Sequence, residues 1–199
     1  PTEEIVLTLR PARAPDGALT GFVVVAGDAS AASGREAALR RLAALDPLTG
    51  ILNRRAFLAA AVRAVEDSRR AGGPISVVAF DVDRFKALND THGHAAGDAA
   101  LQGMAECVAS LLRADEPFGR LGGDEFAIVL PGLGRAAAVE RALRIGEAVA
   151  ALPLTHPVTL SIGVVERGAR DELFAETLAR ADAALYRAKA AGRDRVAAA

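Results

Sequence analysis

A nearly continuous apolar run at residues 75–80, ISVVAF, leads directly into two aspartates, Asp81 and Asp83. An unbroken run of this length predicts a strand that is buried on both faces, because a strand with one solvated face would alternate apolar and polar residues. Such a strand needs a layer of structure on each side. The run therefore predicts the central strand of a covered sheet, with carboxylates emerging at its end.

The chain from residue 46 onward alternates between strand and helix patterns. Helices are expected at residues 54–70, 96–112, 135–152 and 171–191, and strands at 75–83, 125–130 and 158–166, with a turn at Gly122 and Gly123. Strands interleaved with amphipathic helices predict a sheet covered by helices. The fold class expected is therefore α/β or α+β.

The first 45 residues have a different pattern. Apolar and β-branched runs at residues 5–10 and 22–26 flank a segment rich in Pro, Asp and Gly, which predicts a β-hairpin. This hairpin and its exit resemble the end of a PAS sensor domain. Residues 33–45 form either a coiled-coil connector or an ordinary surface helix, since so short a segment does not decide between them. The expected organisation is residues 1–32, 33–45 and 46–199.

Charge and cysteine content exclude several classes of protein. The 199 residues include 24 Lys and Arg against 25 Asp and Glu, so no strong overall field attracts nucleic acid or a membrane surface. Cys107 is the single cysteine, and no apolar run reaches the roughly 20 residues that span a bilayer. A cytoplasmic domain is expected. The start at Pro1, without a leading Met, suggests a piece of a longer protein.

A second acidic pair follows a two-glycine turn in the segment RLGGDEF at residues 120–126. If its strand neighbours the first one, Asp124 faces Asp81, and such oxygen ligands suit Mg²⁺ together with substrate phosphates. Glycines at the turn let backbone amides approach phosphate oxygens. Either motif alone is also explained by an ordinary hairpin turn and a strand-end cap.

The segment at residues 84–98, RFKALNDTHGHAAGD, is predicted to be a polar, Gly-punctuated loop suited to binding. An Asn and an Asp such as Asn89 and Asp98 can together hydrogen-bond a guanine edge, although both are also ordinary helix caps. His92 and His94 have no Cys or further His nearby, so zinc is not expected. The segment thus predicts a nucleotide contact or a pair of capped helices.

The last predicted helix ends with Lys189, Gly192 and Arg193. Cations at a helix C-terminus are common partners of the helix dipole. They are equally suited to a triphosphate near a metal site. Spacing alone does not choose between these roles.

Four ordered motifs together resemble the GGDEF family of diguanylate cyclases. They are DPLTGILNRRAF from Asp46, DVDRFKALNDTHGHAAGD from Asp81, RLGGDEF from Arg120 and ADAALYRAKAAGRD from Ala181. The resemblance implies a ferredoxin-like, polymerase-palm-like sheet of about five strands. It also implies condensation of two GTP molecules into cyclic di-GMP across a homodimer, with Mg²⁺ or Mn²⁺ as cofactor.

The resemblance assigns roles residue by residue. Metal ligands would be Asp81, the carbonyl of Val82 and Asp124; catalytic residues would be Asp124, Glu125 and Lys86; substrate contacts would be Phe85, Asn89, His94, Asp98, Leu101, Lys189 and Arg193. Asn89 and Asp98 would read guanine, so GTP is the expected substrate. A rival interpretation is a non-catalytic receptor for GTP or cyclic di-GMP, but such decay normally removes the carboxylates, which are present.

One motif departs from the family pattern. The product-inhibition motif RxxD ends five residues before the first glycine of GGDEF, and here that frame has Glu116 after Arg113. The longer side chain puts feedback by cyclic di-GMP in question. Arg144 resembles a secondary inhibitory arginine by position, although an arginine on such a helix usually only solvates the surface.

Overall fold

The computed structural model describes residues 5–13, 19–28, 44–168 and 173–199, which belong to two compact units, Pro1–Ala44 and Leu45–Ala199. In the first unit, strands β1 (Ile5–Arg13) and β2 (Leu19–Asp28) pair antiparallel, with Ile5 opposite Asp28 and Arg13 opposite Leu19. The predicted hairpin strands are therefore present. The predicted connector helix lies largely outside the described residues.

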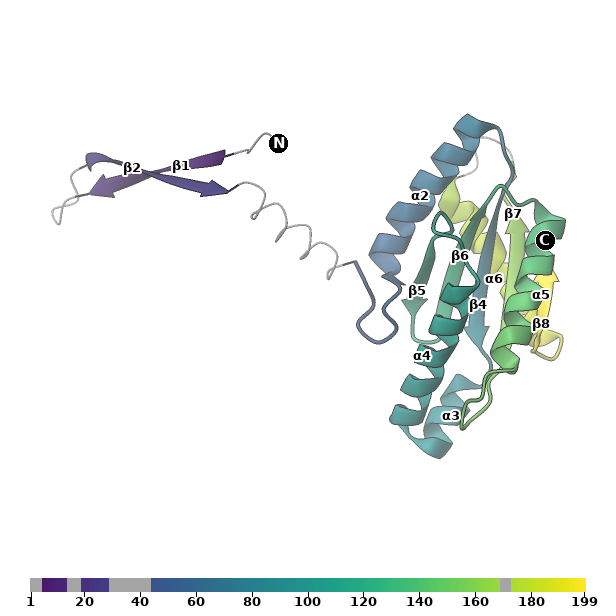
Figure 1. Ribbon diagram of the computed structural model, residues 1–199. Helices are drawn as coiled ribbons and strands as arrows, with labels where there is room; N and C mark the ends of the chain where they lie inside the picture. Colours follow the sequence, from purple (N-terminus) through teal and green to yellow (C-terminus); the bar gives the residue numbers. More distant parts are fainter. Residues whose placement is uncertain (1–4, 14–18, 29–43, 169–172) are drawn as a thin grey trace. The chain divides into compact units, whose positions relative to one another are not determined.

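The second unit contains one mixed sheet with the strand order β3-β5-β6-β4-β7-β8 (Figure 1). Its strands are β3 (Leu52–Asn53), β4 (Ile75–Val82), β5 (Phe118–Gly122), β6 (Glu125–Pro131), β7 (Leu160–Glu166) and β8 (Arg195–Ala198). Central strand β4 pairs antiparallel with both β6 and β7, and the outer pairs β3–β5 and β7–β8 are parallel. The described part of the chain thus has six strands in this sheet, against about five expected.

Helices cover both faces of this sheet. They are α2 (Arg54–Ala71), α3 (Phe85–His92), α4 (His94–Ser110), α5 (Arg135–Ala150) and α6 (Phe174–Ala190). Buried residues of α4 and α5 join one apolar cluster, and those of α2 and α6 join another on the opposite face. The predicted class, a mixed α/β fold with a helix-covered sheet, is confirmed.

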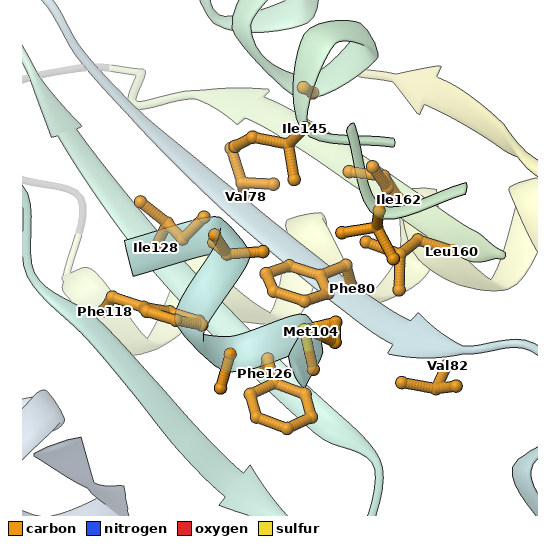
Figure 2. Close-up of a cluster of buried hydrophobic side chains, with 14 of the residues drawn as sticks. Val78, Phe80, Val82, Met104, Phe118, Phe126, Ile128, Ile145, Leu160 and Ile162 are labelled. Carbon is orange, nitrogen blue, oxygen red and sulfur yellow. The ribbon is translucent and has the colours of Figure 1, made fainter. Parts of the chain in front are cut away.

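Strand β4 contains the apolar run at residues 75–80, and its burial explains that run. Every residue of β4 is buried. Val78 and Phe80 belong to the α4/α5 cluster, where Phe80 stacks on Phe126 with ring centroids 5.4 Å apart (Figure 2). Val77 and Ala79 belong to the cluster with α2 and α6 on the opposite face. A strand with two buried faces has no position for an alternating polar residue.

Helix α6 lies unusually close to β7 at Gly163. A Cβ at this position would overlap backbone atoms of α6, the carbonyl oxygen of Ala181 and the amide nitrogen of Leu185. Ala181, Ala184 and Ala188 are also completely buried on the inner side of this helix. Small residues on both elements therefore let main chain pack directly on main chain.

The segment at residues 84–98, predicted to be a loop, is instead helical from residue 85 onward apart from Gly93. Helix α3 occupies Phe85–His92, and α4 begins at His94 after Gly93, whose φ is 83°. No residue of α3 is fully buried, and its apolar face consists of Phe85 and Leu88, which is too short to establish a helical period. The capping alternative is also wrong, because Asn89 and Asp98 lie inside helices.

The short strands β3, β5 and β8 were also not predicted. They have only two to five residues each, too few to establish a period. The longer elements agree with the sequence patterns to within a few residues, although the first residues of the predicted last helix lie outside the described ranges. Among the described residues, no helix is long and apolar enough to cross a membrane.

Candidate active site

Two acidic segments meet at one end of the central strands. Because β4 and β6 are neighbours, Asp81 lies opposite Glu125, and the amide of Val82 donates to the carbonyl oxygen of Asp124 at 3.4 Å. The turn between β5 and β6 needs a left-handed residue, and Gly123 supplies it with a φ of 42°. The predicted proximity of the two carboxylate motifs is therefore observed.

Asp81 is 6% exposed, and its carboxylate lies near two other carboxylates. Burial raises the pKa of its carboxyl; the hydrogen bond from Lys189 opposes this, and repulsion from Asp124 and Asp83 adds to it, so the net pKa shift is upward. The Lys189 ammonium, in the last turn of α6, lies 2.7 Å from Asp81 Oδ2. The local field at this strand end therefore favours a cation.

The donor set fits a hard divalent cation that is completed by its substrate. Among the described residues, no three His, Cys, Asp or Glu side chains form a ready-made metal cage. Mg²⁺ does not need one, because it is typically held by one or two carboxylates and by substrate phosphates. The buried Asp81, the neighbouring carbonyls and Asp124 supply the required oxygens.

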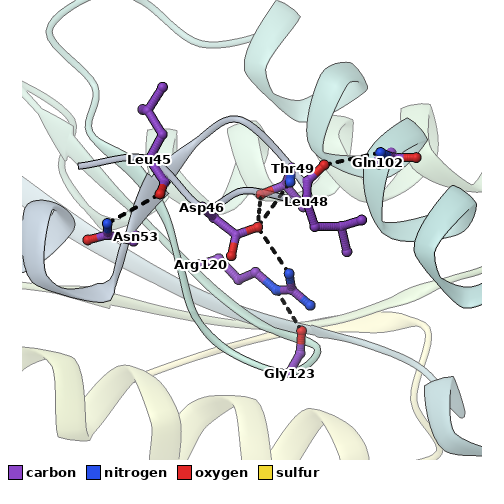
Figure 3. Close-up of polar contacts among 8 residues, drawn as sticks. All are labelled: Leu45, Asp46, Leu48, Thr49, Asn53, Gln102, Arg120 and Gly123. Carbon is purple, nitrogen blue, oxygen red and sulfur yellow. Dashed lines mark hydrogen bonds and ion pairs between the residues drawn. The ribbon is translucent and has the colours of Figure 1, made fainter. Parts of the chain in front are cut away.

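The side chain of Arg120 joins Asp46 to the glycine turn between β5 and β6 (Figure 3). Arg120 Nη1 lies 3.0 Å from Asp46 Oδ1, and its Nε donates to the carbonyl oxygen of Gly123 at 2.8 Å. Burial acts to raise the pKa of Asp46, but hydrogen bonds from Thr49 and the Arg120 guanidinium outweigh it and hold the pKa below its ordinary value. Asp46 and Arg120 both lie in the quoted motifs, yet no role was predicted for either from the sequence.

Helices α3 and α4 pack closely against each other at Asn89 and Gly97, and this place is called the α3/α4 crevice below. Asn89 Oδ1 is buried and has no hydrogen-bond partner in the described part of the chain. A Cβ on Gly97 would overlap this oxygen and would lie 3.1 Å from Cζ of Phe85, so the glycine makes room for both side chains. An orphaned buried acceptor is costly, by about 1–3 kcal/mol. Asn89 therefore carries a buried acceptor that the described part of the protein leaves without a donor.

The other predicted substrate residues of α3 and α4 differ in exposure, whereas Lys189 and Arg193 belong to the end of α6 and the turn after it. Asp98, Lys86 and His94 are exposed on α4 and α3, whereas Leu101 is 1% exposed and belongs to the apolar core beneath. His92 stacks on His156 of the α5–β7 loop, with centroids 3.8 Å apart. His92 therefore contacts another part of the protein, which the sequence did not indicate.

The candidate inhibitory residues are placed differently from one another. Arg113 and Arg144 are exposed, but the Glu116 side chain is only 1% exposed. Glu116 Oε2 accepts the Arg113 amide at 2.8 Å and an ion pair from Arg141 at 3.0 Å. Glu116 therefore closes the α4–β5 loop internally, through an arginine that the sequence did not single out.

Comparison with known proteins gives one consistent result. The family model described as diguanylate cyclase, GGDEF domain, matches residues 43–195. The chain is 36% identical over 161 residues to the probable diguanylate cyclase DgcC of Escherichia coli K12, covering 79% of this chain and 43% of that protein. It is 38% identical over 162 residues to the response regulator PleD of Caulobacter vibrioides, covering 78% and 36%. The chain thus spans less than half the length of these curated relatives.

Solved structures agree with the family match. The coiled coil and GGDEF domain of DgcB from Caulobacter crescentus, in complex with c-di-GMP, superposes with a TM-score of 0.79 at 31% identity, covering 85% of this chain and 93% of that one. Diguanylate cyclase SiaD from Pseudomonas aeruginosa, in complex with its activator SiaC, gives a TM-score of 0.77 at 36% identity, covering 85% and 67%. The chain belongs to the GGDEF family of diguanylate cyclase domains.

Proposed function

We propose that this chain is a diguanylate cyclase that condenses two GTP molecules into cyclic di-GMP and releases two pyrophosphates. The observation that carries the proposal is the pairing, within one unit, of the buried Asp81 beside the GGDEF turn with the orphaned Asn89 acceptor in the α3/α4 crevice. The first is suited to phosphoryl chemistry and the second to a nucleobase. No carboxylate of the two motifs has been lost, which favours an enzyme over a receptor.

Asp81, the carbonyl of Val82 and Asp124 would hold Mg²⁺ or Mn²⁺, with Glu125 beside them on β6. When bound, the cation would supply charge neutralisation at the α-phosphate and would lower the pKa of the attacking 3′-hydroxyl. The protein's own cations, Lys86, Lys189 and Arg193, would hold the phosphates and stabilise the charge that develops on the pyrophosphate. Lys189 already lies against Asp81, at the place where positive charge is favoured.

Guanine selectivity would come from the crevice. Asn89 Oδ1 would accept from the base, and the Asp98 carboxylate would accept from the ring N–H and the exocyclic amino group, which adenine does not present in this pattern. Phe85 and Leu101 would pack against the base, and His94 would contact the nucleotide. A base that leaves buried polar groups unpaired is rejected strongly.

Ring closure would require two domains. Each would hold one GTP, and a homodimer with a two-fold axis would bring the 3′-hydroxyl of one to the α-phosphate of the other. The rate per protein molecule is then expected to rise with protein concentration. A rate that stays strictly proportional to protein down to nanomolar concentrations would contradict this dimer.

The N-terminal hairpin is proposed to be the exit of a PAS-like sensor domain, joined to the cyclase by residues 33–45. Its support is the long antiparallel pairing of β1 with β2. Feedback by cyclic di-GMP at Arg113 and Arg144 is proposed to be weak, because Glu116 is already engaged by Arg141.

The primary test is incubation of purified protein with GTP and Mg²⁺ at high protein concentration, with products identified by mass. Cyclic di-GMP is expected from the parent, and none from an Asp124→Ala control. GTP binding by the parent without any product would contradict the cyclase and favour the receptor.

A further inference from the structure

Asp83 lies two residues after Asp81 on the same strand end, yet its surroundings are quite different. Its Oδ1 accepts the Ser161 hydroxyl at 2.6 Å, and its Oδ2 accepts the Thr159 hydroxyl at 2.7 Å and the Asp194 amide at 3.0 Å. The residue is 9% exposed. Both carboxylate oxygens are therefore satisfied by the protein, through contacts of charge-assisted length.

These three donors come from two separate segments. Ser161 and Thr159 belong to β7 and the residues just before it, and the Asp83 amide donates back to the Thr159 carbonyl oxygen at 2.9 Å. Asp194 belongs to the turn between α6 and β8, 111 residues further along the chain. Asp83 thus joins the end of the central strand to the turn that follows α6.

The segments that meet at Asp83 have strained backbones. Arg193 and Asp194 have φ values of 64° and 47°, and Arg84, the residue that precedes α3, has a φ of 55°. A left-handed conformation costs a residue with a side chain about 1–2 kcal/mol, so it persists only where neighbouring contacts enforce it. The hydrogen bond from the Asp194 amide to Asp83 is such a contact. Arg193 directly precedes Asp194 in the chain, so this bond also constrains the backbone at Arg193.

Asp83, Arg84, Arg193 and Asp194 line one cavity of about 520 Å³ at this end of the sheet. The cavity is open, and two arginines contribute positive charge to it. Arg193 is one of the cations assigned above to the GTP phosphates. Its backbone position depends on a turn whose amide is held by Asp83.

We propose that Asp83 is a positioning residue, which holds the α6–β8 turn in its left-handed conformation so that Arg193 meets the terminal phosphates of GTP. This inference rests on the proposed function, because it assumes that GTP binds at this end of the sheet. Asp83 acts through Arg193 and does not ligate the metal, since its oxygens are already occupied.

Two substitutions separate this role from metal ligation. In Asp83→Asn, the amide oxygen can keep the Asp194 and Thr159 bonds, and the amide NH₂ can donate to Ser161, whose hydroxyl also accepts. Asp83→Ala removes all three bonds. The positioning role predicts that the Asn variant keeps turnover within a few-fold of the parent and that the Ala variant does not. A metal ligand would instead lose turnover in both, as Asp81→Asn is expected to do.

The decisive measurement is equilibrium binding of GTP and of GMP without divalent metal, where no turnover occurs. The parent is expected to prefer GTP over GMP, and Arg193→Ala and Asp83→Ala are each expected to reduce that preference roughly tenfold. Adding Asp83→Ala to Arg193→Ala should reduce it no further, since both act on the same contact. Affinity for GMP should stay near that of the parent in all variants.

Each outcome is informative. Full GTP preference in Asp83→Ala, or additive losses in the double variant, overturns the positioning role. Loss of turnover in a folded Asp83→Asn overturns it in favour of metal ligation. If Asp83→Ala does not fold, Asp83→Asn still decides the question. A parent that binds neither nucleotide refutes the proposed function itself, and this inference with it.

Discussion

The replacement Gly97→Ala should separate the stability of the domain from its affinity for substrate. The added methyl would overlap Asn89 Oδ1, lie 2.9 Å from Asn89 Cγ and meet Phe85 Cζ at 3.1 Å. Asn89 has a short, partly buried side chain whose Oδ1 has no partner in the described part of the chain, so it can rotate away. The clash is therefore relieved by moving one of the groups that are expected to contact guanine.

Gly97→Ala is expected to have opposite effects on the free energy of unfolding and on the affinity for GTP. Alanine is favoured over glycine in a helix interior by about 1 kcal/mol, so the unfolding free energy should change little or increase. A lost hydrogen bond to the base costs about 0.5–1.5 kcal/mol, which corresponds to a rise in KM for GTP of up to roughly tenfold. The value of kcat should change less, because the metal site lies outside the crevice.

The assay is steady-state cyclic di-GMP formation, with chemical denaturation of the same samples. Gly146→Ala in α5 is the matched control, because its Cβ would meet Ile162 Cδ1 at an ordinary 3.7 Å. In an Asn89→Ala background, Gly97→Ala should change KM by less than about twofold, since the clash is gone. An unaltered KM in the single variant, or a stability loss beyond about 2 kcal/mol, the scale of an overpacked core, would refute this reasoning.

Four further substitutions test the surrounding framework. Arg141→Ala leaves the buried Glu116 carboxylate without its cation and should lower the unfolding free energy by about 3 kcal/mol in urea titrations, whereas Glu116→Gln, which removes the buried negative charge itself, should cost less. The lowered pKa of Asp46 means that its ion pair with Arg120 stabilises the fold at neutral pH. The free energy of unfolding of the parent should therefore exceed that of Asp46→Asn by an amount that shrinks as pH falls through and below the ordinary pKa of 3.8. A difference that does not depend on pH would count against the pair. Asp81→Asn removes a buried negative charge that Asp124 and Asp83 repel, so the melting temperature of the variant without metal should equal or exceed that of the parent. In a thermal-shift assay, Mg²⁺ at ten times its Kd should stabilise only the parent, by about 1.4 kcal/mol.

The sequence predicted those features that depend on local pattern. The run before Asp81 identified a strand with two buried faces, and the two glycines identified the tight turn before Asp124. Both inferences need only the residues within one element or turn. The pairing of β4 with β6, which brings Asp124 beside Asp81, was a condition of the sequence argument and is supplied by the structure.

Long-range contacts were not predictable in this way. Arg120 meets Asp46 across 74 residues, and Asp83 meets Asp194 across 111, so no period or spacing could indicate either pair. Helix α3 was missed for another reason: it has only eight residues, and its apolar face of Phe85 and Leu88 is too short to establish a helical period. The internal role of Glu116 likewise depends on Arg141, which is an ordinary helix arginine until the fold brings the two together.

The contact at Gly163 has a consequence for how the domain can evolve. Because α6 rests on β7 through backbone atoms, the separation of these elements is set by peptide geometry and hardly by side-chain volume. Lys189 lies on α6, and Asp81 lies on β4, which pairs with β7. The distance between Lys189 and Asp81 therefore depends on the fixed separation of α6 and β7. Substitutions on the outer side of α6, where Tyr186 is 73% exposed, can accumulate without moving the lysine. Homologous sequences should therefore diverge freely on that outer side while keeping small residues where α6 meets Gly163, at Ala181 and Ala184.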